Sequence, residues 1–345
     1  MIRASTALLL ILGSLWFLIG CNADRNNSSA ENQDALAQVT LTLNDEEGWT
    51  EIDRLKIVSK TGEILIGKYV YESVGNDLDA MLRLNSGKYA ALTNKQEFAT
   101  AITKDLRDLS HDMHLALYLK PQVMPQHGAM DADTHDMSGQ YDAERDTVEA
   151  VMLDDDIGLL TLTGLDYYES GDFGARLDAE MAALAKAKAL ILDLRVNYGG
   201  NPEAVTHVSS YFFAEPTHLV SSDFRGGARM ERWTYTGLPN RTFSSEPLYV
   251  LTSKRTFSAG ESLVFGLKAS SRASVIGEET AGGGNFGGEV RVSPDFVLWV
   301  SIGRTFDPRT GDGWEATGVS PDVEVDSSLA FDVATELAKA SLAKG

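Results

Sequence analysis

The sequence predicts an α/β protein that carries a small helical region towards its N-terminal end. From Thr50 to Leu109 apolar residues recur at three- to four-residue steps, which is typical of helices that bury one face. Beyond Val148, short apolar runs alternate with helical stretches, as in βαβ units. At roughly 100–200 residues per domain, a chain of 345 residues is expected to form about two domains.

The composition excludes several classes of protein. Apolar residues make up 43% of the chain and charged residues 23%, which is not the usage of a disordered, collagen-like or coiled-coil protein. Asp and Glu number 50 against 30 Lys and Arg, so the formal charge of -20 argues against nucleic acid as a partner. The single cysteine, Cys21, excludes an internal disulfide framework and a cysteine-based zinc site.

The N-terminal segment predicts a signal peptide followed by a lipid anchor. An apolar run from Ala7 to Ile19 suits the signal-peptide core and is too short to span a bilayer about 30 Å thick. The Leu-Ile-Gly-Cys sequence ending at Cys21 resembles the bacterial lipoprotein lipobox, which implies cleavage before this cysteine and its lipidation. We therefore expect a signal peptide over residues 1–20, a lipidated tether over 21–37, and a location at a membrane of the bacterial cell envelope. The alternative is a secreted protein with a leftover thiol.

Residues 38–120 are predicted to form the helical N-terminal domain, in segments broken at Gly62 and Gly75. After His114 the period changes to two, so the chain is expected to pass from helix into strand there. Residues 121–147 are rich in Pro, Gly and acids and predict a loop or junction. Methionines and histidines between residues 124 and 137 offer a soft-metal site as a minor alternative to an ordinary loop.

Residues 148–345 are predicted to form the α/β domain. The patterns predict strands at 157–162, 190–194, 248–251, 274–277 and 296–300, and helices at 175–189, 203–213, 259–269 and 329–343.

A serine lies where the strand at 248–251 leads into the following helix. Ser258 is placed at the mouth of that helix, where backbone amides carry partial positive charge and could stabilise an oxyanion. The small residues Ala259 and Gly260 would let a substrate approach closely. Alternatively, Ser258 is an N-cap, with Glu261 completing a capping box.

A second turn follows the strand at 190–194. The sequence from Asp193 to Asn201 ends in Gly199-Gly200, a bend whose amides are free to face a ligand. It matches neither a dinucleotide-binding fingerprint nor a P-loop. Asp193 and Arg195 are expected to brace this turn by a local ion pair.

Four motifs in order resemble the tail-specific, or C-terminal processing, serine proteases, in the branch of the tricorn protease core and the interphotoreceptor retinoid-binding protein repeats. They read ALILDLRVNYGGN, LYVLTSKRTFSAGESLVFGLK, SRASVIGEETAGGGN and WEATGVSPDVEV. The resemblance implies a Clp protease/crotonase-like ββα core with a helical N-terminal domain. It also implies Ser258 as nucleophile, and an oxyanion hole of the Ala259 amide with that of Gly199 or Gly200.

The resemblance leaves the base to a histidine. Processing proteases of another branch use a lysine from a glycine-rich loop, and the corresponding segment here, residues 280–285, has none. His114, in the D-x-H-L sequence that starts at Asp112, is the favoured base because it adjoins the predicted strand. His111 is the rival, since Ser110-His111 matches the serine-histidine pair of the tricorn type.

The resemblance also implies Glu315 as the group that orients the base, with a solvated loop carboxylate as the alternative. The expected activity is hydrolysis of peptide bonds through an acyl-enzyme on Ser258, with a peptide or protein as substrate and no metal or organic cofactor. The competing prediction, from a different class of protein, is a non-catalytic module on the same fold that binds apolar ligands or proteins.

Overall fold

A computed structural model describes residues 48–120, 147–166 and 173–344. The lipidation candidate Cys21 and the Met/His loop at 124–137 lie outside the described residues, so both remain predictions. From Thr50 onward the chain forms one compact unit. No helix in the described ranges is both long enough and apolar enough to cross a membrane.

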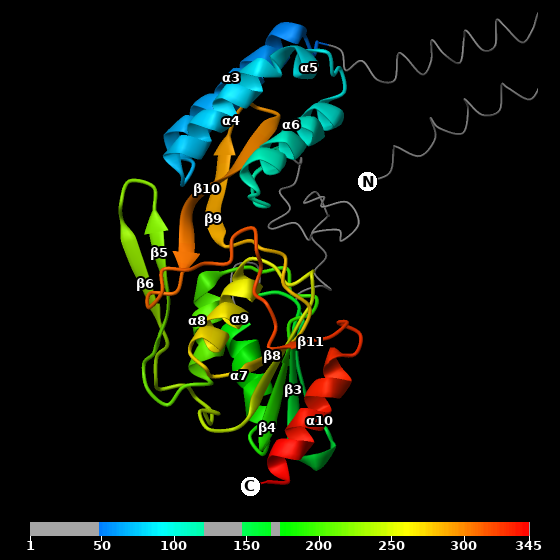
Figure 1. Cartoon of the computed structure of the whole chain (residues 1–345), viewed down its shortest axis with the longest axis vertical. Helices are drawn as coiled ribbons and strands as arrows, with labels where there is room; N and C mark the ends of the chain where they lie inside the picture. The colour runs from blue at the N-terminus through cyan, green and yellow to red at the C-terminus, as the bar shows by residue number, and fades with distance from the viewer. Residues whose placement is uncertain (1–47, 121–146, 167–172, 345) are drawn as a thin grey trace, which may run out of the picture. The chain divides into compact units, whose positions relative to one another are not determined.

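The N-terminal part of this unit is helical (Figure 1), as predicted. It comprises α3 (Glu51–Lys68), α4 (Glu72–Leu84), α5 (Ser86–Ala90) and α6 (Lys95–Ser110). The expectation that Gly62 and Gly75 break the helices was wrong, since they lie inside α3 and α4. A Cβ atom at Gly62 would lie 2.0 Å from the Asp79 carboxylate, and one at Gly75 would lie 2.7 Å from the Leu65 carbonyl. These glycines allow the two helices to pack closely.

The larger part is built on a six-stranded sheet in the order β11-β8-β7-β4-β3-β2. Its strands are β2 (Val148–Met152), β3 (Ile157–Leu162), β4 (Ala189–Asp193), β7 (Leu248–Thr252), β8 (Ser274–Gly277) and β11 (Val323–Glu324). All neighbours pair in parallel except β2, which pairs antiparallel with β3 at one edge. The apolar runs predicted as buried strands therefore form the centre of a parallel sheet, as expected for strands covered on both faces.

Helices cover both faces of this sheet. On one face pack α7 (Phe173–Ala183), α8 (Pro202–Ser210) and α9 (Ala259–Ala269), which bury Leu177, Val205 and Leu263 against the strands. On the other face packs α10 (Ala330–Leu342), through its small residues Ala330, Ala334 and Ala338. The predicted helix at 175–189 ends at Ala183, because the chain turns there towards β4.

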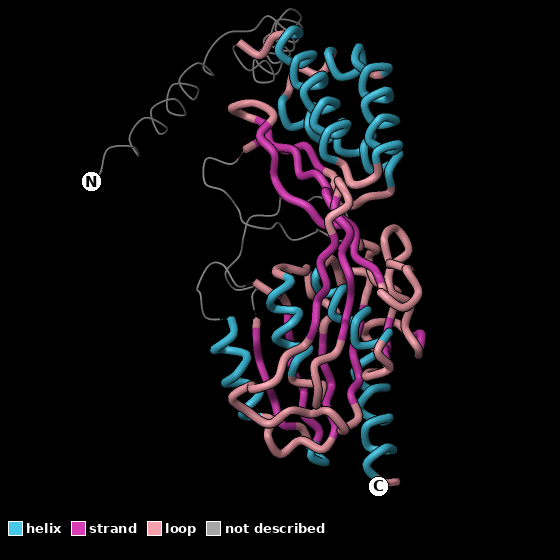
Figure 2. Tube along the Cα trace, turned by 90° about the vertical axis from the view of Figure 1, so that its left-hand side faces the viewer, coloured by secondary structure: helices cyan, strands magenta, loops and turns pink. Residues whose placement is uncertain are grey.

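A second, antiparallel sheet escaped the sequence prediction except for β1 and the first half of β10. It has the order β1-β10-β5-β6, with β9 also paired to β10. Its strands are β1 (Ala116–Leu119), β5 (His218–Phe224), β6 (Arg229–Trp233), β9 (Asn285–Arg291) and β10 (Phe296–Phe306). Figure 2 shows these extended strands running between the helical region and the parallel sheet. The long strand β10 pairs with β1 near its start and with β5 near its end, so it connects the two regions.

Candidate active site

The turn after β7 presents Ser258 in a strained conformation. Its backbone has φ 53° and ψ -117°, a combination that residues with a side chain rarely adopt and that occurs at functional sites. Ser258 is partly exposed, whereas its neighbours Phe257 and Ala259 are buried. The predicted N-terminus of the next helix is confirmed, because α9 begins at Ala259.

The Gly-Gly turn after β4 lies against the serine turn. The amide of Phe257 donates to the carbonyl of Asn197 over 2.9 Å, because β4 and β7 are neighbours and their carboxyl ends meet. Gly199 and Gly200 have φ of 101° and 137°, which favour glycine. A Cβ atom at Gly199 would lie 2.8 Å from Cβ of Ser258, so only glycine allows this approach. The predicted ion pair that braces the turn is present, with Arg195 Nη2 and Asp193 Oδ2 2.7 Å apart.

Two backbone amides beside Ser258 have no hydrogen-bond acceptor in the part of the chain that the structure describes: those of Ala259 and Gly200. The Gly199 amide differs, since it donates to Asn197 Oδ1 over 2.9 Å. The Gly199 carbonyl accepts from Leu165 over 2.8 Å, and in a planar trans peptide the next amide points the opposite way. The Gly200 amide therefore points away from Leu165 and is available to a ligand.

His114 lies beside the serine. Its ring nitrogen Nε2 is 3.0 Å from Ser258 Oγ, which is hydrogen-bond distance. The ring is buried and packs against Phe257, with centroids 4.5 Å apart, and lies 6.5 Å from the Trp299 ring. His111, the rival, instead ends α6 in the left-handed conformation at φ 58° and is exposed. The structure therefore brings His114, and not His111, to Ser258.

Two carboxyl groups lie near this pair. Asp112 is fully buried, and its Oδ1 accepts the backbone amide of His114 over 2.9 Å and lies 3.9 Å from the ring nitrogen Nδ1. Glu315 lies on the other side of the glycine-rich loop, where its Oε2 accepts the amides of Gly284 and Asn285, each over 2.6 Å. The other oxygen of Glu315, Oε1, is buried and has no hydrogen-bond partner among the described residues.

Burial and the negative charge of Asp112 raise the pKa of Glu315 well above its usual range, against the two amides that favour its ionised form. The neutral form of Glu315 is therefore favoured more than that of an ordinary glutamate, and this form supplies no charge to an imidazolium.

Glu261 joins the serine turn to the glycine-rich loop. It is fully buried and accepts four hydrogen bonds: from the amides of Ser258, Gly282 and Gly283, over 2.7–2.8 Å, and from the Thr280 hydroxyl over 2.6 Å. Burial raises the pKa of Glu261 to about 7, against these four donors. The hydrogen bond from the Ser258 amide to Glu261 is part of a capping box, as predicted.

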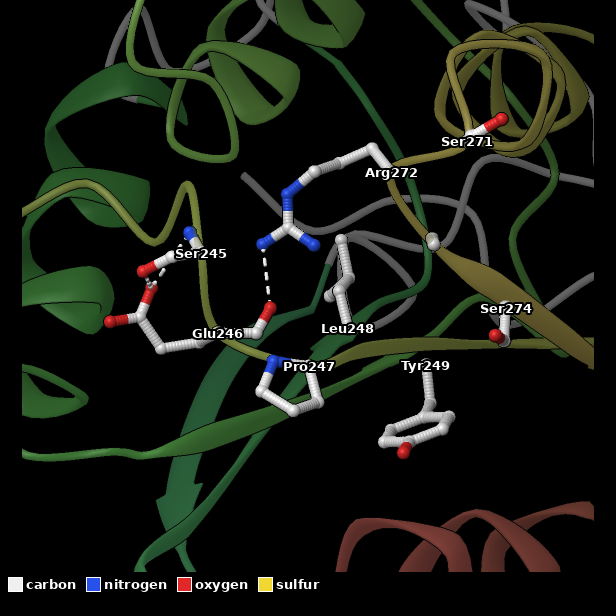
Figure 3. A pocket seen from close by; sticks show the side chains of 9 residues that line it. Ser245, Glu246, Pro247, Leu248, Tyr249, Ser271, Arg272 and Ser274 are labelled. Carbon is white, nitrogen blue, oxygen red and sulfur yellow. Dashed lines mark hydrogen bonds between the residues drawn. The ribbon is translucent and has the colours of Figure 1, made fainter. Parts of the chain in front are cut away.

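A surface pocket of about 270 Å³ lies far from this chemistry (Figure 3). It is lined by residues just before β7, such as Ser245, and just before β8, such as Arg272, and so lies at the amino ends of these strands. Ser258 follows the carboxyl end of β7. The Arg272 guanidinium already donates to the carbonyls of Phe212 and Glu246, over 2.7 and 2.9 Å, so it is not a free anion-binding group.

The sequence prediction missed several residues of this site. Asp112 was quoted only as part of the histidine motif, and Glu261 only as a helix cap. Tyr69 and Asn285 were not singled out, although both donate to Asp112. An acid two residues before a candidate base was the available signal for Asp112. No cluster of three or more potential metal ligands occurs in the described ranges.

Two family models match the chain. The model for peptidase family S41 matches residues 156–325, and the model for the N-terminal domain of peptidase S41 in eukaryotic IRBP matches residues 52–151. Together they cover most of the chain and the whole of the site described above.

The chain is also similar to curated processing proteases. It is 32% identical over 178 residues to the chloroplastic carboxyl-terminal-processing peptidase 2 of Arabidopsis thaliana, which is 51% of this chain and 33% of that protein. It is 25% identical over 185 residues to the carboxy-terminal processing protease CtpA of Bacillus subtilis, which is 52% of this chain and 37% of that protein. The chain thus spans about a third of the length of these relatives.

Solved structures share the fold. The photosystem II D1 C-terminal processing protease matches with a TM-score of 0.53 and 18% identity, over 80% of this chain and 94% of that one. A lipoprotein from Streptococcus agalactiae matches with a TM-score of 0.56 and 16% identity, over 84% and 96%. The tricorn protease matches with a TM-score of 0.50 and 13% identity, over 85% and 37%. The predicted fold class is confirmed.

Proposed function

Because this chain belongs to peptidase family S41, we propose that it hydrolyses peptide bonds through an acyl-enzyme on Ser258, with His114 as the base. The observation that carries the proposal is the 3.0 Å distance between Ser258 Oγ and His114 Nε2, beside two unengaged amides. A serine hydroxyl is a weak nucleophile until a positioned base takes its proton. The glycine-rich loop lacks a lysine, so the proposed enzyme is of the serine-histidine type.

In the proposed mechanism Ser258 Oγ attacks the carbonyl carbon of the scissile bond while His114 Nε2 takes its proton. The amides of Ala259 and Gly200 donate to the oxyanion; Gly199, the other candidate, holds the turn against Ser258. His114 then protonates the leaving amine, the carbon–nitrogen bond breaks, and water releases the acyl group by the reverse steps. Glu315 is proposed to support the site by holding the backbone at Gly284 and Asn285.

Labelling with a fluorophosphonate probe tests this proposal. We expect the wild-type protein to label at one site, Ser258→Ala not to label, and His114→Ala to label at least about a hundredfold more slowly. His111→Ala is the matched control and is expected to label at the wild-type rate. A wild-type protein that takes no label would refute the proposed activity and favour the non-catalytic binding module.

We further propose that lipidated Cys21 anchors the enzyme at a membrane of the bacterial cell envelope, where it acts on peptides or proteins. The support is the lipobox-like sequence, and acyl chains gain about 0.8 kcal/mol per buried methylene. Expression of wild type and Cys21→Ala in a bacterial host with a labelled fatty acid tests the anchor. Label in the Cys21→Ala protein, or a wild type that stays in the soluble fraction, would contradict it.

A further inference from the structure

A histidine base needs a third group that holds its ring and stabilises the charged form. The resemblance to processing proteases implies Glu315 for this task. We infer from the contacts around His114 that Asp112 performs it instead, as a positioning residue. The inference rests on the proposed role of His114 as the base.

Asp112 contacts both the backbone and the ring of His114. Oδ1 of Asp112 accepts the His114 amide over 2.9 Å, and the same oxygen lies 3.9 Å from the ring nitrogen Nδ1. Oδ1 thus fixes the backbone position of His114 and also faces Nδ1, whereas the other ring nitrogen, Nε2, faces Ser258. An opposite charge at this distance favours the protonated imidazole, which is the form that exists after proton transfer.

The other oxygen of Asp112 is held by two donors from distant parts of the chain. The Tyr69 hydroxyl donates to Oδ2 over 3.1 Å, and the Asn285 side-chain amide donates to it over 3.0 Å. Burial raises the pKa of Tyr69, so its hydroxyl stays a donor. With the His114 amide on Oδ1, three hydrogen bonds hold the two oxygens of Asp112 and prevent the carboxyl from turning away from His114.

Glu315 serves Asp112 indirectly. Its Oε2 holds the Asn285 backbone amide, and the side chain of the same Asn285 reaches Asp112. Burial and the charge of Asp112 raise the pKa of Glu315, which favours the neutral form of Glu315 beside the Asp112 carboxyl. The other titratable or charged groups around this cluster are Tyr71, Glu261 and Arg304. None of them is changed in the variants below, so their electrostatic effect on His114 is the same in each.

Two variants with unchanged side-chain volume separate the two carboxyls. Asp112→Asn removes the charge while an amide can still accept the His114 amide proton, and Glu315→Gln mimics a neutral glutamic acid. We expect Asp112→Asn to slow fluorophosphonate labelling by about 10²-fold or more and to move the acidic midpoint of its pH profile down by about 1–3 units. Glu315→Gln is expected to keep the wild-type midpoint.

An NMR titration of the His114 ring, in the Ser258→Ala background, gives a second readout that needs no activity. Asp112→Asn is expected to lower the pKa of His114, and Glu315→Gln to leave it unchanged. An unchanged His114 pKa in Asp112→Asn, or a fall in Glu315→Gln alone, would overturn the inference. If wild type takes no label, the proposed function fails, and the titration still decides the role of Asp112.

Tyr69→Phe covers the case in which Asp112→Asn does not fold. It removes one of the donors that hold the Asp112 carboxyl against His114, so the pKa of His114 is expected to fall. A merely structural Asp112 would give no such shift, and its absence in Tyr69→Phe would again overturn the inference.

Discussion

The serine and the histidine of this site are held in different ways. Ser258 lies on a strained turn of the parallel sheet, and its backbone is fixed by Glu261 and by the neighbouring glycine turn. His114 lies between α6 and β1, and its ring is fixed by Asp112 and by packing against Phe257. The comparison teaches that Ser258, the proposed nucleophile, is held by neighbours that follow two adjacent strands of one sheet, whereas His114, the proposed base, depends on contacts that join two regions.

The largest loss of stability around Ser258 is expected from a substitution at Glu261. Both oxygens of Glu261 accept two hydrogen bonds, so Glu261→Gln leaves two buried donors without an acceptor. Each such donor costs about 1–3 kcal/mol, which predicts a loss of about 2–6 kcal/mol in the free energy of unfolding. Urea unfolding measures this loss. Glu279→Gln, on an exposed carboxylate that accepts the Ser320 hydroxyl, is the control and should change stability by less than about 0.5 kcal/mol.

A substitution at Gly283 is expected to disturb the packing of the His114 ring against Phe257. A Cβ atom there would lie 2.3 Å from the Phe257 ring and 2.9 Å from Cε1 of His114. We expect Gly283→Ala to cost about 1–3 kcal/mol through overpacking and to slow probe labelling by displacing the His114 ring. Gly288→Ala is the matched control, because its Cβ atom would meet nothing within 4 Å. Equal rates for both variants would show that the packing of His114 does not matter.

The charge balance at Glu315 predicts a dependence on pH. Because the folded protein raises the pKa of Glu315, it binds this proton more tightly than the unfolded chain, whose glutamates titrate near 4.5. The contribution is complete below that value and is lost as pH rises, by at most about 1.4 kcal/mol per pH unit. We expect the free energy of unfolding to fall more steeply from pH 6 to pH 8 in wild type than in Glu315→Gln. Parallel plots of the free energy of unfolding against pH for the two proteins would contradict a raised pKa of Glu315.

The smallest effect is expected where β1 is attached to α6. Thr103 Oγ1 donates to the carbonyl of Leu117 and accepts its amide, both over 2.9 Å. Thr103→Val keeps the shape and removes both bonds, so we expect a loss of about 1 kcal/mol in thermal or urea unfolding. Thr100→Val, on the exposed face of the same helix, serves as the control. A Thr103→Val protein as stable as this control would show that β10 alone holds β1.

The parts of the fold that were predictable are those whose residues are buried on both faces. The runs at 157–162 and 248–251 are continuous and apolar, so their strands were predicted within a residue or so. The strand β5 was missed because its buried residues include the polar Ser221 and Ser222, β6 because it is mostly exposed, and β9 because it carries Gly287 and Gly288. The helix breaks predicted at Gly62 and Gly75 failed because tertiary packing overrode the low helix propensity of glycine.

The residues of the site that lie within a sequence motif could be predicted. The sequence placed Ser258, Ala259 and the glycine turn correctly at strand ends, since such turns follow from strand and helix boundaries. The choice of His114 over His111 depended on where α6 ends, and the left-handed cap at His111 turns the chain so that the next histidine faces the serine. The inferred role of Asp112 could not be predicted from the sequence, because its donors Tyr69 and Asn285 are brought to it only by the fold.

The pairing of β1 with β10 has a consequence for the order of folding. Ala116 pairs with Trp299, about 180 residues further along the chain, so closing this loop carries a large entropic cost and brings a long-range contact late. During synthesis the strand that follows His114 has no partner until β10 has been made. A nascent chain, or one truncated before Phe296, lacks the strand that pairs with β1, so we expect His114 to be held beside Ser258 only after β10 has been made.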